Sequence, residues 1–374
     1  MIIFTPRLVA LDSSHWANWI AAFDSHDGRQ RDAARSFHGT LLTKGWVVFL
    51  SFHNISELLA IENESKTRRR IEFVRSLPLL AWFQTPGNQS SVGDITDIVA
   101  AEAIACCEGL EDPREIANRA KDHLIRFGNG IEALGEDDRV WQILRPLMIQ
   151  RSERDRTITA IAPFRVHDED TTLAQLLQGQ LSSPTDVERK LAAIEAKIER
   201  QVKEKGDRRI KDPSIIAKIF VREVVDKAGR PDSVADLVVS QFIEAGLELH
   251  EIREHMTIGE LSRLATFRRQ LRIVAPKTDR SFQELRKSVR MERCPHWIIT
   301  QDMRRHAPDL PERKGSDLVD GYLAVLAAYV DHLFVDKRTE ETFRRLPKAS
   351  QTLRIVKRVS KAGKFEQILD VLEK

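Results

Sequence analysis

The segment Trp46–Phe52 constrains the fold of this chain more than any other stretch of the sequence. It is rich in β-branched and aromatic residues, a pattern typical of a parallel strand that is buried on both faces. Shorter apolar runs at Leu8–Leu11 and Leu79–Phe83 lie before and after it, and helical patterns separate the three. Strands that alternate with helices are joined by right-handed crossovers, so the sequence predicts an α/β fold with a parallel sheet.

Helical patterns replace strand-like runs over about residues 84–289. The clearest is Val187–Val202, where apolar side chains recur at steps of three and four residues. The α/β character returns with an apolar helix over 317–330 and a short strand at Leu333–Val335. We therefore predict an α/β domain formed by residues 1–83 and 311–348, a helical insertion over 84–310, and a C-terminal helical tail over 349–374.

The composition fits a globular protein of the cytoplasm. The chain has 374 residues, of which 42% are hydrophobic and 31% charged, and 59 basic residues against 56 acidic ones give a net charge of +3. Cys106 and Cys107 are adjacent and Cys294 is remote, so the three cysteines indicate neither a disulfide framework nor a metal knuckle. We find no signal peptide and no apolar run of ~20 residues, and we expect no membrane association.

Acidic side chains follow the ends of the predicted strands. Asp12 comes directly after the first strand, and Glu57 lies in the first turn of the helix after the second. Asp317 and Asp320 open the late helix, and Asp336 follows the last strand. Carboxylates at one edge of a parallel sheet repel each other, and a hard cation such as Mg²⁺ or Mn²⁺ relieves that repulsion. Such a metal activates water and holds a phosphodiester, so the acids point to phosphodiester hydrolysis.

Most of these acids also have a purely structural interpretation. Asp320 is the exception, because the helix that follows, Gly321–Val330, is apolar on every side and an acid at the mouth of a buried helix needs a partner. The structural alternatives are an N-cap for Asp12, a capping box with Asn54 for Glu57, a helix-dipole contact for Asp317, and a surface ion pair with Lys337 or Arg338 for Asp336.

The order of these acids resembles that of the PIN-domain nucleases. The similarity rests on Asp12, on Glu57, and on the segments Ser316–Asp320 and Tyr329–Arg338. It implies a PIN-like three-layer domain with a parallel sheet, interrupted here by the mostly α-helical insertion. It also implies a catalytic cluster that binds Mg²⁺ or Mn²⁺. In that cluster Asp12 is the first acid, Glu57 the second, Asp320 or Asp317 the third, and Asp336 the fourth.

The resemblance implies an endonuclease that cuts RNA in preference to single-stranded DNA. Toxin and anti-phage defence nucleases are the settings it suggests. Because an unregulated ribonuclease would harm its host, we also expect a regulatory protein partner, and we leave open whether the chain forms a homo-oligomer. Two positions depart from the family pattern. Ser14 replaces the asparagine or threonine found after the first acid in many relatives, and Phe334-Val335-Asp336 replaces a Thr-x-Asp at the last strand.

Basic residues near the late acids are candidates for binding substrate phosphates, although a solvated loop explains part of the set equally well. The alternative from another functional class is an inactive PIN-like scaffold whose helical insertion binds a protein partner. A phosphatase with Asp12 as nucleophile lacks its second acid, because Ser14 occupies that position. The candidate phosphate-binding residues are Arg304, Arg305, Arg313, Lys314, Lys337 and Arg338.

Overall fold

The chain forms a mixed α/β structure around a mostly parallel sheet, in a computed structural model that describes residues 6–61, 63–85, 88–161, 168–178, 184–228, 234–308 and 316–373. It divides into an α/β unit, residues 1–152, 274–308 and 319–374, and a second unit, residues 153–273 and 309–318. The strands are β1 (Arg7–Leu11), β2 (Trp46–Leu50), β3 (Leu80–Thr85), β4 (Asn88–Val92), β5 (Ile125–Gly128), β6 (His332–Val335) and β7 (Arg358–Lys361).

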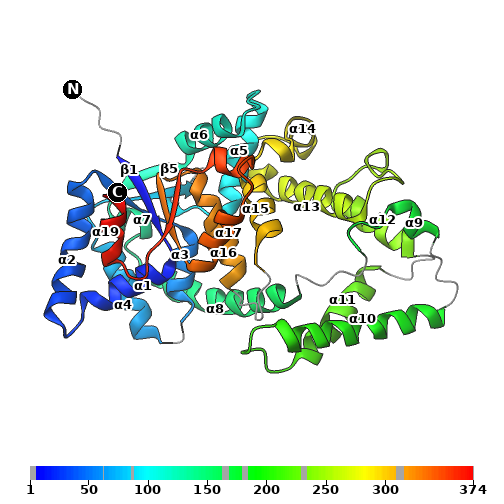
Figure 1. Cartoon of the computed structure of the whole chain (residues 1–374), viewed down its shortest axis with the longest axis horizontal. Helices are drawn as coiled ribbons and strands as arrows, with labels where there is room; N and C mark the ends of the chain where they lie inside the picture. The colour runs from blue at the N-terminus through cyan, green and yellow to red at the C-terminus, as the bar shows by residue number, and fades with distance from the viewer. Residues whose placement is uncertain are drawn as a thin grey trace. The chain divides into compact units, whose positions relative to one another are not determined.

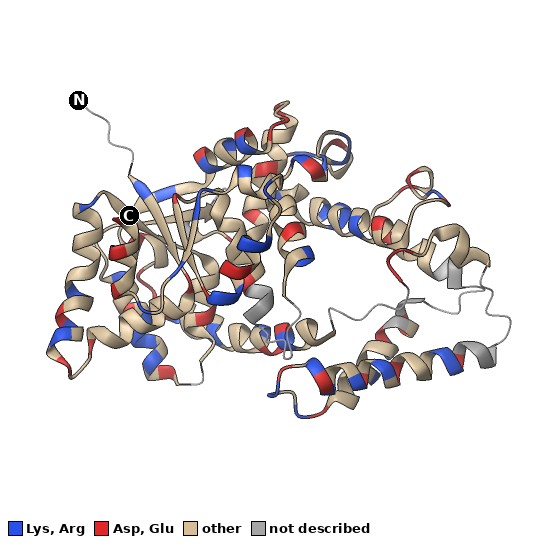
Figure 2. Ribbon diagram, viewed as in Figure 1, with Lys and Arg blue, Asp and Glu red and all other residues tan. Residues whose placement is uncertain are grey.

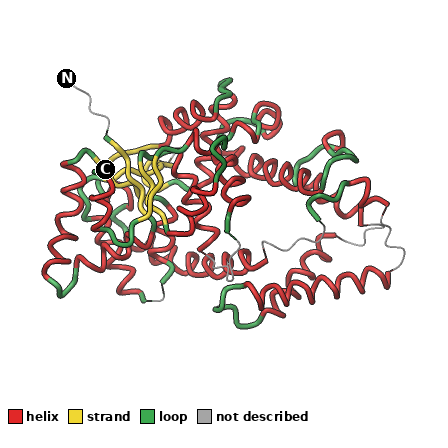
Figure 3. Tube along the Cα trace, in the orientation of Figure 1, coloured by secondary structure: helices red, strands yellow, loops and turns green. Residues whose placement is uncertain are grey.

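The sheet is ordered β4-β3-β2-β1-β6-β7, and β5 also pairs with β3. Strands β3, β2, β1, β6 and β7 are parallel to their neighbours in this order, while β4 and β5 both run antiparallel to β3. All these strands lie in the α/β unit, as Figures 1 and 3 show. The central position of β1 and the crossover connections confirm the predicted parallel arrangement of the first three strands and β6.

Alternate residues of the central strands enter two separate cores, one on each face of the sheet. Val9 and Val48 belong to one core, whereas Leu8 and Val47 belong to the other. This alternation explains why all five residues of β2 are buried. Helices over the first face are α1 (Ser13–Phe23), α2 (Gly28–Thr43), α3 (Phe52–Leu59), α4 (Glu64–Arg75), α7 (Gly130–Leu134) and α19 (Glu366–Leu372).

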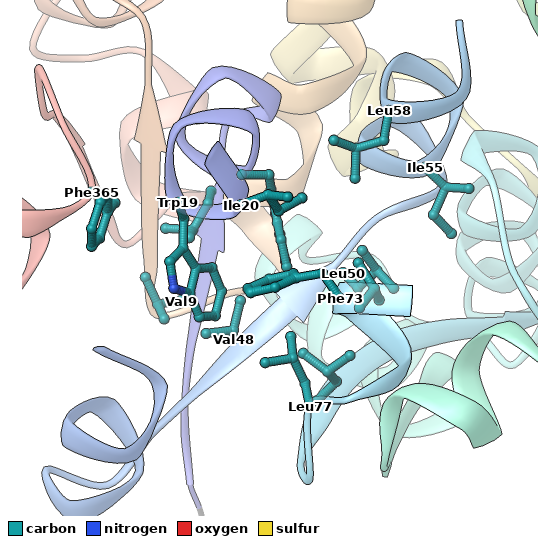
Figure 4. Packing of buried hydrophobic residues seen from close by; sticks show 14 of the residues in the cluster. Val9, Trp19, Ile20, Val48, Leu50, Ile55, Leu58, Phe73, Leu77 and Phe365 are labelled. Carbon is teal, nitrogen blue, oxygen red and sulfur yellow. The ribbon is translucent and has the colours of Figure 1, made fainter. Parts of the chain in front are cut away.

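Trp19 lies at the centre of the first core, where Figure 4 shows it beside side chains of β1 and β2. Its ring meets those of Phe37 and Phe73 edge-on, with centroids 5.0 and 4.9 Å apart. The indole N–H donates to the Ala34 carbonyl at 2.8 Å, so the buried polar atom is satisfied. The same core includes Phe365 of the C-terminal segment, whose ring meets that of Phe37 edge-on and so packs the start of α19 against α2.

The second face is covered mainly by helices from the later part of the chain. The segment Leu323–Val330 is buried throughout, which confirms the expectation that an all-apolar helix there lies inside the protein. These helices are α5 (Ile95–Cys107), α6 (Pro113–Leu124), α15 (Pro295–His306), α16 (Ser316–Val325), η4 (Leu326–Ala328), α17 (Lys337–Arg345) and α18 (Gln351–Ile355). The unit also contains η2 (Ala275–Lys277), α14 (Phe282–Ser288) and η3 (Met291–Arg293).

Three strands lie where the sequence indicated only helices. β4 and β5 fall inside the predicted insertion, and β7 falls inside the predicted helical tail. All three are short, and β7, with the sequence Arg-Val-Ser-Lys, is an edge strand with one apolar residue. Edge strands carry charged and polar residues that oppose aggregation, so they lack the apolar run that reveals a buried strand. The insertion and the tail therefore both contribute to the sheet, contrary to the predicted domain boundaries.

The second unit is helical, with two small cores of its own. One core joins α9, α12 and α13 through residues such as Leu173, Phe242 and Leu261, and the other joins α10 and α11 through Ile198 and Ala217. Acidic and basic side chains are interspersed along α10, as Figure 2 shows. The elements are α9 (Leu173–Gln178), α10 (Pro184–Lys205), α11 (Pro213–Ala228), α12 (Val234–Glu244), η1 (Leu249–Glu251) and α13 (Ile258–Val274), and α8 (Asp138–Ile161) spans the boundary between the units.

No helix in the described part of the chain is long and apolar enough to cross a membrane.

Candidate active site

Two acids follow neighbouring parallel strands at the carboxyl edge of the sheet. Asp12 comes directly after β1 and Asp336 directly after β6, and the two strands pair with Leu11 opposite Phe334. The backbone N–H of Asp12 continues this pairing by donating to the Phe334 carbonyl at 2.9 Å. The strand register therefore brings these two predicted site residues to the same edge, as the parallel arrangement requires.

Each of these two acids is also the N-cap of the helix that follows it. One carboxylate oxygen of Asp12 accepts from the Ser14 backbone N–H at 2.7 Å, and one oxygen of Asp336 accepts from the Thr339 N–H at the same distance. Within the described residues, the second oxygen of each acid accepts no hydrogen bond. The N-cap interpretation of Asp12 is confirmed, and one oxygen remains for another ligand. Ser14, the departure from the family pattern, contributes its backbone here.

Asn54 ties the start of α3 to the end of β1. Its side-chain amide donates to the Leu11 carbonyl at 2.9 Å and to the Ser13 hydroxyl at 3.1 Å. The Asn54 side-chain oxygen forms a capping box with Ser51, the N-cap of α3. The expected capping box between Asn54 and Glu57 is therefore wrong, because Asn54 is the third residue of the helix and pairs with Ser51. This leaves the Glu57 carboxylate without a capping role.

Glu57 lies one turn further along α3, close enough to Asp12 for the two charges to interact. Partial burial raises the pKa of the Glu57 carboxyl, a hydrogen bond from the Ser13 hydroxyl opposes that rise, and the negative charge of Asp12 adds to it. A carboxylate whose ionised form is disfavoured in this way is a favourable ligand for a cation. The Glu57 carboxyl therefore lies near both Asp12 and Ser13.

A stacked pair of rings brings α16 to the same edge. The imidazole of His53, the second residue of α3, stacks on the Tyr322 ring with centroids 5.3 Å apart and planes 8° from parallel. Asp320 is partly buried two residues before Tyr322, on the first turns of α16. Asp317 is in the same helix, but its side chain lies outside the described residues. The structure therefore places Asp320 on a helix that contacts the segment between β2 and Glu57.

The surroundings of His53 indicate a neutral side chain. Burial, together with the positive charge of Arg151, lowers the pKa of His53 to about 4, and the charge of Asp94 opposes this change. Asp94 is the N-cap of α5 and accepts from the Thr96 N–H at 2.8 Å. Asp94 is a further acid near this edge of the sheet. It follows β4, whose last residue, Val92, pairs with Gln84 near the carboxyl end of β3.

The candidate phosphate-binding residues occupy two helix ends and one segment that is not described. Arg304 and Arg305 are exposed in the last turn of α15. Lys337 and Arg338 form the first turn of α17, directly after Asp336. Arg313 and Lys314 lie outside the described residues. Of these candidates, Lys337 and Arg338 are joined to the acidic edge by the chain itself.

Comparison of the chain with known proteins identified no family. No protein-family model, no curated protein and no solved structure matches the chain.

The donor set at this edge fits a hard divalent cation. Asp12, Glu57 and Asp336 offer only carboxylate oxygens, the ligands that Mg²⁺ and Mn²⁺ prefer. Sequence reasoning missed Ser13 and Asp94 near this edge, and it paired Asn54 with Glu57 instead of Ser51. For Asn54 the signal was present, because Ser51 followed three residues later by a polar side chain is a capping-box pattern.

Proposed function

We propose that this protein is a metal-dependent nuclease that hydrolyses phosphodiester bonds, with RNA as the favoured substrate. One observation carries the proposal. The charges of Asp12 and Glu57 interact, and Asp336 directly follows β6, the strand that pairs with β1 next to Asp12. Asp12, Glu57, Asp320 and Asp336 would hold Mg²⁺ or Mn²⁺, with Asp317 as an alternative to Asp320 or a support for it. The order of these acids supports the proposal through its resemblance to the PIN-domain nucleases.

The chain's own residues prepare this edge for a cation. Backbone N–H groups fix one oxygen each of Asp12 and Asp336, so the carboxyl groups keep their orientation without a metal. Asn54 and Ser13 hold the Glu57 helix against the end of β1. A bound Mg²⁺ or Mn²⁺ supplies an activated water and charge stabilisation at the phosphate.

Basic residues would hold the nucleic acid next to the acids. Lys337 and Arg338 at the start of α17 are the closest candidates in the chain, and Arg304, Arg305, Arg313 and Lys314 extend the set. Contacts of this kind bind phosphates without reading the base sequence, and they weaken as salt rises. We propose that the enzyme acts on RNA in the cytoplasm, in a toxin or defence setting, under the control of a protein partner.

Cleavage of labelled single-stranded RNA and DNA tests this proposal. The purified chain is incubated with Mn²⁺, Mg²⁺ or EDTA, beside the variants Asp320→Asn and Asp32→Asn. Asp32 is an exposed acid on α2 and serves as the matched control. We expect metal-dependent cutting that Asp32→Asn retains and that Asp320→Asn loses by at least about 100-fold. Equal cutting by wild type and Asp320→Asn would remove Asp320 from the site.

An inactive scaffold is the second candidate, and exposed apolar side chains favour it. Ile143 and Leu147 of α8 are 69% and 53% exposed, and Ile215 and Ile219 of α11 are each 53% exposed. Each pair lies one turn apart on its helix, a spacing suited to a protein partner. This candidate predicts that Mn²⁺ leaves the melting temperature unchanged, whereas a filled metal site raises it by mass action.

A further inference from the structure

A buried cluster of metal-ligand side chains lies between α5 and α15, separate from the carboxylates at the sheet edge. Glu102 and Cys106 are four residues apart on α5 and therefore share one face of that helix. Cys294 is the N-cap of α15, and His296 is in its first turn. All four side chains are buried, and Glu102 has no exposed surface. Two helices that meet in the core thus each contribute two potential ligands.

The ligand atoms are close enough to meet one ion. The ligand atoms of Glu102, Cys294 and His296 all lie within 4.8 Å of one another. Cys106 is outside this group of three, but its thiol lies next to that of Cys294, which itself donates to the Arg290 carbonyl at 3.3 Å. Around a tetrahedral zinc, bonds of ~2.0–2.3 Å hold the ligand atoms roughly 3.3–3.8 Å apart. Glu102, Cys294 and His296 are near that arrangement already, and the Cys106 side chain has to move toward them to complete it.

The chemistry of the four side chains selects the metal. Two thiols, one imidazole and one carboxylate form a set that suits Zn²⁺, whereas Mg²⁺ and Mn²⁺ prefer oxygen ligands alone. Four protein ligands fill a tetrahedral shell, which is typical of a structural site without an open position. We propose that Glu102, Cys106, Cys294 and His296 bind one Zn²⁺ ion, which fastens α15 to α5.

The surrounding hydrogen bonds already orient the carboxylate of this site. Glu102 accepts from the backbone N–H of His296 at 2.9 Å and from the Tyr329 hydroxyl. These two contacts remain compatible with a bound ion, as partners that support a ligand from behind. The third contact, between His296 Nδ1 and a Glu102 oxygen at 2.6 Å, is shorter than the spacing of two zinc ligands. That contact opens when zinc binds, and both thiols release their protons.

Zinc content of the intact chain, purified and dialysed against metal-free buffer, tests the proposal. We expect about one zinc per chain for wild type, and at least about tenfold less for Cys106→Ser and Cys294→Ser. Cys107→Ser is the matched control, because Cys107 is adjacent to Cys106 in sequence but is not one of the four proposed ligands. The control should keep its zinc. Wild type without zinc, or variants that keep it, would overturn the proposal, the latter by placing the ion elsewhere.

A second measurement needs no variant, in case the serine substitutions prevent folding. Wild type is produced in cobalt-supplemented medium, and its absorption spectrum is recorded. Tetrahedral cobalt bound to thiolates gives an intense charge-transfer band with visible d–d bands, which we expect. Bound cobalt without the charge-transfer band, or no bound cobalt, contradicts the site. A mass two hydrogens lower after isolation under non-reducing conditions, with the disulfide mapped to Cys106 and Cys294 in a protease digest, would contradict it as well. The test does not depend on nuclease activity, so it stands or fails separately from the proposed function.

Discussion

The side-chain amide of Asn54 donates a hydrogen bond to the backbone carbonyl of Leu11 at 2.9 Å. This bond crosses from α3 to the last residue of β1, and Asn54 is 1% exposed. It sets the distance between the end of β1, where Asp12 begins the next helix, and the turn of α3 that contains Glu57. The spacing of the first two acids therefore depends on one buried amide.

Replacing Asn54 by alanine should destabilise the protein and also disturb the site. The substitution removes the bonds to Leu11, Ser13 and Ser51 and leaves buried polar groups without partners. We expect a loss of about 2–4 kcal/mol in the free energy of unfolding, measured with urea. Asn63→Ala, which removes an exposed N-cap of α4, is the control and should cost ~1 kcal/mol. Similar losses in the two variants would show that Asn54 is an ordinary cap.

The raised pKa of Glu57 gives the stability of the metal-free protein a pH dependence of known sign. The folded state disfavours the ionised carboxylate, so Glu57 lowers stability at neutral pH and has no effect where both states are protonated. Glu57→Gln should therefore raise the free energy of unfolding at pH 7 in EDTA, and the gain should disappear below about pH 4. Urea unfolding at the two pH values measures it. A loss of stability at pH 7, relative to the exposed control Glu72→Gln, contradicts the interpretation.

Lys277 holds the N-terminus of α5 through a buried acid. Its ammonium contacts a carboxylate oxygen of Asp97 at 2.7 Å and the Thr96 hydroxyl at 2.6 Å, and Asp97 is 1% exposed. Lys277→Met leaves that carboxylate without its cation, and we expect a loss of about 2–4 kcal/mol after allowance for the partial exposure of the lysine. Arg119→Met breaks an exposed pair with Glu108 and should change little. Equal thermal shifts in the two variants would refute the difference.

Binding of RNA should depend on Lys337 in a way that salt reveals. Lys337 is exposed in the first turn of α17, next to Asp336. Lys337→Gln should weaken binding of unrelated RNA sequences equally, and it should reduce the slope of log affinity against log salt by about one. Fluorescence anisotropy in EDTA measures both effects. Lys348→Gln, exposed beyond the other end of α17, should leave the slope unchanged; if it reduces the slope equally, the phosphate contact is not specific to the acidic edge.

The sequence was sufficient to predict the central strands of the sheet, because strands covered on both faces are continuous apolar runs. β1, β2 and β3 fall where Leu8–Leu11, Trp46–Phe52 and Leu79–Phe83 predicted them. β7 was missed because an edge strand need not be apolar, and its place depends on pairing with β6. Local patterns also placed Asp12 and Asp336 at one edge once the sheet was known to be parallel.

The sequence could not predict contacts between distant segments of the chain. The Asn54 bond to Leu11 and the stacking of His53 on Tyr322 join parts of the chain that no spacing rule connects. The approach of Cys294 to Cys106 is of the same kind, because it depends on how α15 packs against α5. The sequence Cys294-Pro-His296 was the only local sign of that cluster. Chemistry that depends on packing becomes visible only when the fold is known.

The most direct test of the central claim is single-turnover cleavage of labelled RNA as a function of Mn²⁺ concentration, for wild type and Asp12→Asn. The asparagine keeps the size and one oxygen of Asp12 but removes its charge from the edge shared with Glu57. We predict saturable, metal-dependent cutting by wild type, and a cleavage rate at least about 100-fold lower for Asp12→Asn. Identical curves for the two proteins, or no cutting by wild type at any Mn²⁺ concentration, would contradict the account.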